Sequence, residues 1–200
     1  RTDSDSRFVR HDSATAGTDN FIAGNNAGDA IQSGGNYNTV VGNEAGTAIT
    51  TGDNNTAVGF EALSTEDANS NNTAVGYRAL KTLNAGADAY NTAVGADAGT
   101  SITSGLYNNL IGGLAGDAIT TGDENIAIGV NALTAETAGN QSIAIGGGAL
   151  AAQNSSSDTD MNNVAVGYHA GLSVTTGTYN TLIGAKAGDA TFNRNVKIGS

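Results

Sequence analysis

The chain has 200 residues and a formal net charge of −11, and its composition is rich in Gly, Ala, Asn and Thr with no Pro, Cys or Trp. Aromatic residues make up 5% of the chain, which excludes a core built on large rings and leaves small and aliphatic side chains to form one. The acidic charge disfavours binding to nucleic acid or to an anionic membrane, and the lack of Cys excludes disulfides and zinc–thiolate sites.

Residues 1–19 are polar, with one short apolar pair at Phe8 and Val9, and are predicted to be a leader or linking segment. Residues 20–200 form the repeat domain described below. No apolar run in the chain approaches the roughly 18 residues that span a bilayer. The chain begins with Arg1 and has no signal-peptide pattern, which suggests a processed form or a fragment.

From residue 20 onward the chain repeats a short motif whose clearest copies read NTAVG. The stretch NNTAVGFEAL at 54–63, for example, returns as NNTAVGYRAL at 71–80. A near-constant period of about 17 residues predicts a solenoid in which each repeat is one coil. The glycines that close the motif, called rung glycines here, are Gly24, Gly42, Gly59, Gly76, Gly95, Gly112, Gly129, Gly146, Gly167, Gly184 and Gly199.

The residue before each rung glycine is almost always β-branched, as expected for a short strand stacked on its copies. We therefore expect this position to be a core column of the solenoid. Its members include Val41, Val58, Val75 and Val94.

The residue two before each rung glycine lies on the opposite face of the strand and is also apolar. A strand that is apolar on both faces is normally covered on both, and the little remaining chain favours a second copy as the cover. The alternative is that exposed alanines need no cover. The predicted subunit interface comprises Ile22, Val40, Ala57, Ala74, Ala93, Leu110, Ala127, Ala144, Ala165 and Leu182.

Two further columns are predicted to be structural. Asn stands four residues before nearly every rung glycine, as in Asn38, Asn55, Asn72 and Asn91, where its amide can bond from coil to coil. Ala stands three residues after the rung glycine in each of the ten complete repeats, and the position after that Ala alternates in pairs between Gly and Leu.

The motif SIAIGGGALA at 142–151 and its relatives resemble the head repeats of trimeric autotransporter adhesins. The NTAVG wording is also similar to repeats of phage tail-fibre-like and bacterial surface proteins that often precede a self-cleaving chaperone domain. The resemblance covers residues 20–199 and implies a left-handed parallel β-roll with three chains around one axis. The coil here is about three residues longer than in those heads, and Val-Gly-x-x-Ala also partly fits a single-chain left-handed β-helix.

Neither end of the repeat looks capped, which suggests that the rod continues in a longer protein or stacks end to end into a filament. Such stacking is an alternative function to an adhesive rod.

Few residues carry chemistry. Gly-Asp turns make Asp53, Asp123 and Glu124 candidate Ca²⁺ ligands, with simple turn chemistry as the alternative. A solvated acidic stripe broken by arginine explains Glu44, Glu61, Arg78 and Asp97 better than a glycosidase pair does. His169 reads as a solvated loop residue, and the interrupted Thr columns argue against an ice-binding array.

We therefore expect an all-β, left-handed parallel β-solenoid of about eleven rungs that forms a homotrimer in an extracellular fibre, cell-surface appendage or virion fibre. It is expected to be structural and adhesive, presenting loops to a host or neighbouring cell surface or glycan, without catalysis and with no cofactor beyond the candidate Ca²⁺. Its alternatives are a subunit of a self-assembling filament and a glycan-binding or glycan-cleaving tail spike.

Overall fold

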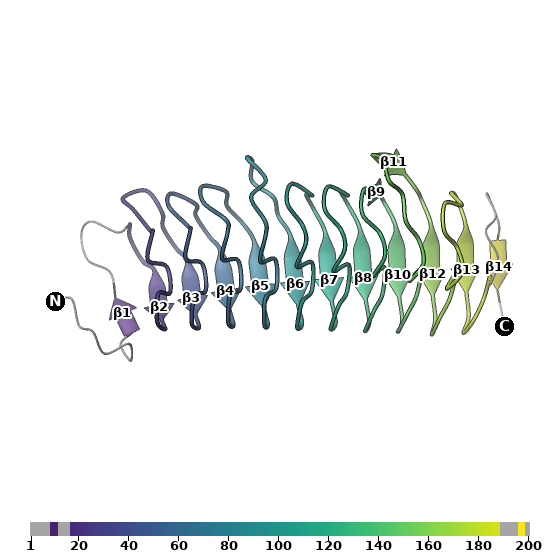
Figure 1. Ribbon diagram of the computed structural model, residues 1–200, viewed down its shortest axis with the longest axis horizontal. Coiled ribbons are helices and arrows are strands. Elements are labelled where there is room, and N and C mark those ends of the chain that lie inside the picture. The colour runs from purple at the N-terminus through teal and green to yellow at the C-terminus, as the bar shows by residue number, and fades with distance from the viewer. Residues whose placement is uncertain (1–8, 12–16, 189–195, 199–200) are drawn as a thin grey trace.

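The computed structural model describes residues 9–11, 17–188 and 196–198, which form an all-β solenoid without helices. The coils stand side by side along one long axis, and each contributes one short strand to a single long sheet (Figure 1). Eleven of its strands run parallel, so the predicted parallel β-solenoid is confirmed. These strands are β2 (Phe21–Ala23), β3 (Thr39–Val41), β4 (Thr56–Val58), β5 (Thr73–Val75), β6 (Thr92–Val94), β7 (Asn109–Ile111), β8 (Ile126–Ile128), β10 (Ile143–Ile145), β12 (Val164–Val166), β13 (Thr181–Ile183) and β14 (Val196–Ile198).

The strands pair in a register that places equivalent positions of the repeat on top of each other. Thr56 of β4 lies opposite Thr73 of β5, and Val58 lies opposite Val75. The pairing extends past the strand, since the Gly59 N–H donates to the Val41 carbonyl oxygen at 2.8 Å. Equivalent residues of successive coils therefore form columns along the rod.

The N-terminal edge of the long sheet differs from the prediction. Strand β1 (Val9–His11) runs antiparallel to β2 and pairs with it, so the backbone of the predicted leader occupies an edge that we expected to be bare. The rest of the leader, residues 1–8 and 12–16, lies outside the described residues. A second, two-stranded sheet joins β9 (Gly139–Asn140) to β11 (Thr159–Asp160) on the loop side of the rod.

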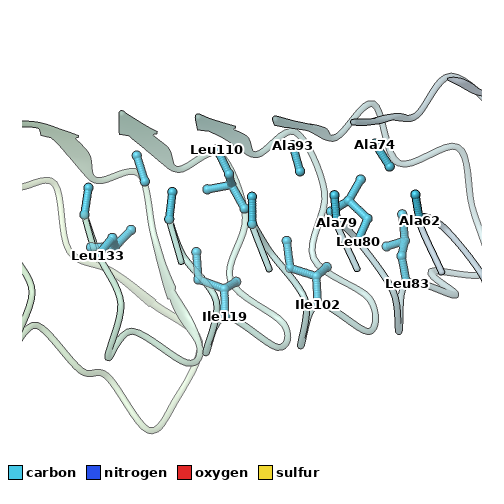
Figure 2. Packing of buried hydrophobic residues seen from close by; sticks show 14 of the residues in the cluster. Ala62, Ala74, Ala79, Leu80, Leu83, Ala93, Ile102, Leu110, Ile119 and Leu133 are labelled. Atoms are coloured by element: carbon cyan, nitrogen blue, oxygen red, sulfur yellow. The ribbon is translucent and has the colours of Figure 1, made fainter. Parts of the chain in front are cut away.

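The interior of the rod is filled from both walls of each coil. In the parallel strands from β2 to β13, the central residue points inward, as Ala74, Ala93 and Leu110 do in Figure 2, and meets side chains such as Ala79 and Ile102 from the opposite wall. This reverses our assignment of the two strand faces. The predicted subunit-interface residues are at most 6% exposed within their own chain, namely Ile22, Val40, Ala57, Ala74, Ala93, Leu110, Ala127, Ala144, Ala165 and Leu182.

The alternation of Gly and Leu four residues after the rung glycine reflects which side chain fills the interior of the coil. A Cβ on Gly116 would lie 2.8 Å from the Cδ1 atom of Ile119, which already fills that space. In the next coil Leu133 fills the equivalent space, and the residue three further on is the buried Glu136. Coils with Leu can therefore place a polar side chain where coils with Gly place Ile or Val.

Candidate interaction surface

The solvent side of the long sheet, called the outer strand face here, is formed by the first and third residues of each strand. Val94, Ile111 and Ile183 are 37%, 42% and 39% exposed, although the position before the rung glycine was predicted to be core. The predicted core residues Val41, Val58 and Val75 are likewise only half-buried. From β3 to β13 the face comprises Thr39, Val41, Thr56, Val58, Thr73, Val75, Thr92, Val94, Asn109, Ile111, Ile126, Ile128, Ile143, Ile145, Val164, Val166, Thr181 and Ile183, none of which is charged.

Aromatic side chains border the outer strand face. Tyr37 precedes a strand and is 59% exposed, whereas Phe60 directly follows a rung glycine and is 40% exposed. Two ring pairs stack from coil to coil with centroids 5.7 Å apart, Phe60 on Tyr77 and Tyr90 on Tyr107. Every large apolar side chain exposed among the described residues lies between five positions before and two positions after a rung glycine. The exposed apolar surface is thus concentrated along one side of each coil.

The predicted Asn column forms a buried ladder at the entrance to the strands. The Asn38 carboxamide oxygen accepts the Asn55 backbone N–H at 2.8 Å, and the Asn38 Nδ2 donates to the Gly52 carbonyl at 2.8 Å. Asn55 repeats the pattern toward Asn72, and Asn72 accepts from Asn91. The ladder satisfies backbone groups that would otherwise be buried without partners, so it is a structural element.

The ladder changes at Ser142, the one position of the column without Asn among the described coils. Here Gln153 takes over, with its Nε2 donating to the Ser142 hydroxyl at 2.8 Å and to Glu136 Oε2 at 2.9 Å. Its Oε1 accepts from Asn163 Nδ2 at 2.7 Å. This buried network was not predicted, since no repeat column marks Gln153.

The predicted glycine column lies where coils approach most closely. From Gly24 to Gly167 the rung glycines have φ between 130° and 143°, and a Cβ on any of these would lie 2.2–2.7 Å from the carbonyl oxygen of the next rung glycine. Both observations require glycine. The four predicted positions are Gly42, Gly59, Gly76 and Gly95.

The candidate Ca²⁺ ligands are engaged in the turns. Asp53 Oδ1 accepts the Asn36 backbone N–H at 2.6 Å, and Asp123 Oδ1 accepts the Leu106 N–H at 2.7 Å, four coils further along. Burial, with nearby negative charge, raises the pKa of Asp123. Glu124 accepts from the Gln141 side chain at 3.2 Å. Within the described residues, no three His, Asp or Glu side chains are grouped to hold a metal ion.

Glu61 and Asp97 of the acidic stripe form ion pairs with Lys81 and Arg78. Lys81 Nζ lies 2.6 Å from Glu61 Oε2, and Arg78 Nε lies 3.5 Å from Asp97 Oδ1. The His169 ring stacks on Tyr168 with centroids 3.8 Å apart.

No helix suitable for crossing a membrane occurs in the part of the chain that the structure describes. Comparisons with protein-family models, curated proteins and solved structures found no match to this chain. Its function has to be argued from the surface itself.

Proposed function

We propose that the chain is the rod segment of an extracellular fibre, in which three copies pack side by side through their outer strand faces. The observation that carries this proposal is the outer strand face itself, a continuous uncharged strip of Val, Ile and Thr with one Asn on an otherwise acidic chain. Contiguous exposed apolar surface of this kind usually marks an interaction site. Three is the number of chains that the resemblance to adhesin heads implies.

The dimensions of the strip suit a second copy. With strands about 4.8 Å apart and three residues wide, it is roughly 40 Å long and about 10 Å across, before the aromatic borders are added. A standard interface buries on the order of 800 Å² on each partner, so the proposed interface draws on the aromatic borders as well as on the strip itself. Since two copies each carry −11, close approach is favoured where both surfaces are uncharged.

The surface formed by the turns and loops is suited to presenting those loops to a partner. Turns and loops of variable length lie on the side of the coils away from the strands (Figure 1). A stiff rod that repeats weak contacts along its length gains affinity through multivalency, without a deep pocket. We therefore propose attachment to a partner surface as the role of the loops, and no catalytic role. End-to-end stacking is less favoured, because β1 already pairs with the edge of β2.

Light-scattering mass measurement tests the assembly. The wild type is expected to have the mass of three chains, and Ile128→Glu, which places a charge in the middle of the strip, the mass of one. The matched control Thr121→Glu adds the same charge at an exposed turn of the preceding coil and is expected to stay trimeric. A wild type that stays at one chain mass at tens of micromolar overturns the lateral assembly.

Attachment is tested separately with beads coated with the wild-type rod. They are expected to adhere to cultured cell layers more than albumin-coated beads do, and equal adherence removes the adhesive role while leaving the rod.

A further inference from the structure

Glu66 is a carboxylic acid inside an aliphatic column of the rod. It stands seven residues after its rung glycine, a position held by Ile49 in the preceding coil and by Leu83 in the following one. All three side chains are 0% exposed. Nothing in the rod-forming role described above uses this acid.

Only one oxygen of the Glu66 carboxyl is satisfied. Oε1 accepts the backbone N–H groups of Asp67 and Asn69, each at 3.1 Å. Oε2 is buried and has no hydrogen-bond partner, and the same holds for the Asn69 Nδ2. Burial raises the pKa of Glu66 to about 7 and the charge on Asp67 adds to this, against the lowering effect of the two backbone donors and of the nearby Asn69 side chain.

Glu136 occupies the equivalent position four coils later and is fully satisfied. Its Oε1 accepts from the backbone of Gly139 at 2.8 Å and of Ser155 at 2.9 Å, and its Oε2 accepts from Gln153 Nε2 at 2.9 Å. The chain thus contains two buried acids in the same column. Both carboxyl oxygens of Glu136 accept hydrogen bonds, whereas only one oxygen of Glu66 does.

Among the described residues, no neighbouring cation compensates the charge of Glu66. The two cations of the following coil are engaged elsewhere, Lys81 with Glu61 and Arg78 with Asp97. On its own coil the charged neighbour is Asp67, which is negative. The charged side chains of the two adjacent coils are Glu44, Asp53, Arg78, Lys81 and Asp88.

We propose that the segment around Glu66, residues 64–70, is a pH-dependent opening point of the rod, closed around a neutral carboxyl and opened when that carboxyl ionises. An ionised carboxylate with an unpaired buried oxygen is costly, and opening the segment returns it to water. Opening leaves the rest of the solenoid in place, because each coil contacts only its neighbours.

The direction of the pH effect follows from the two states. Below about pH 4.5 the carboxyl is protonated in both the closed and the open segment, and closure is at its most stable. Between about 4.5 and 7 the open segment loses its proton while the closed one keeps it, so closure weakens by up to about tenfold per pH unit. Above about 7 both forms are ionised, and the effect levels off.

Hydrogen exchange measured by mass spectrometry between pH 4.5 and 8.5, corrected for intrinsic rates, tests the proposal on the full chain. Peptides covering 64–70 are expected to show an opening constant that rises about 100-fold or more, while peptides covering 134–140 around Glu136 stay level. Glu66→Gln keeps the shape of the side chain, and Glu66→Leu matches the column. Both are expected to abolish the rise in 64–70.

Two results overturn it. One is a rise that persists in both variants, and the other is an equal rise in every peptide of the wild type, which would report global unfolding. Neither result depends on the number of chains in the rod, so the test is separate from that of lateral assembly.

Discussion

Asn125 donates its backbone N–H to the carboxamide oxygen of Asn108, one coil earlier, at 3.0 Å. The Nδ2 of Asn108 donates to the Gly122 carbonyl oxygen of that next coil at 2.8 Å. One buried side chain therefore satisfies a donor and an acceptor of the following backbone turn. The column of such residues joins the coils along the rod independently of the strands.

Replacing Asn108 by Ala is expected to lower the free energy of unfolding by about 2–4 kcal/mol, because a buried N–H and a buried carbonyl both lose their partner. Denaturant-induced unfolding followed by circular dichroism measures this. Asn84→Ala removes the same side chain from an exposed loop position and is expected to change stability by less than about 0.5 kcal/mol. Equal effects of the two substitutions would mean that the ladder contributes no stability.

The rung glycines are expected to tolerate no side chain. In Gly112→Ala the new Cβ would lie 2.6 Å from the Gly129 carbonyl oxygen at a φ of 134°, so a cost above about 4 kcal/mol or failure to fold is expected. Gly86→Ala also introduces a Cβ at positive φ, 71°, but with no atom within 4 Å, and its cost is expected to be about 1 kcal/mol. Thermal unfolding of the two variants separates close approach from backbone strain. Comparable melting temperatures would contradict this account.

The columns were predictable from the sequence, but the orientation of the strand was not. Alternation separates Ala74 from Val75 without saying which of them points inward. Its bulk and β-branching favour Val75 as the core residue. At Ala74 the coil is too narrow for that choice, since the large side chains of the opposite wall, such as Leu80 and Leu83, leave room only for a small one. The invariance of Ala three residues after the rung glycine already pointed to a tight interior.

The buried polar side chains were harder to predict. Glu66 and Glu136 fall in segments whose sequence is typical of polar loops. The alternation of Gly and Leu does not show that this Leu fills the space that Ile fills in the coils with Gly. The role of Gln153 can be inferred only from its hydrogen bond to Ser142, the residue that interrupts the Asn column. The aromatic border, in contrast, follows fixed positions of the repeat, and a column-by-column reading of Tyr and Phe would have found it.

Gln153→Ala is expected to destabilise the rod by about 3–5 kcal/mol, because it leaves the buried Glu136 Oε2 without its donor and removes the acceptor of Asn163 Nδ2. Gln32→Ala, the same change at an exposed position, is expected to be nearly neutral. Denaturant midpoints of the two variants provide the measurement. A midpoint for Gln153→Ala that matches the wild type would show that the network is dispensable.

The two buried acids are expected to respond to the same substitution with opposite signs. At pH 8, Glu66→Leu should stabilise the protein by about 1–2 kcal/mol, since removing a charged carboxylate with an unsatisfied buried oxygen outweighs the loss of the two 3.1 Å contacts from the Asp67 and Asn69 N–H groups. The gain should shrink toward pH 4, where the carboxyl is protonated in both states. Glu136→Leu should destabilise at both pH values, because several backbone N–H groups lose their acceptor. Unfolding curves at the two pH values give the comparison, and a destabilising Glu66→Leu at pH 8 would contradict the burial argument.

Insertions are expected to be tolerated on the loop side and nowhere near the strands. The coil between β5 and β6 carries a protruding loop, in which Asn84 and Gly86 to Asp88 are exposed (Figure 1). Six Gly/Ser residues placed after Gly86 should change the melting temperature by only a few degrees, because lengthening a surface loop adds little closure entropy. The same six residues placed after Val75 would displace Gly76 from its column and shift every later contact of that coil, so loss of cooperative folding is expected there. Melting curves of the two insertion variants test this difference in tolerance. A large loss of stability from the loop insertion would mean that this loop supports the solenoid.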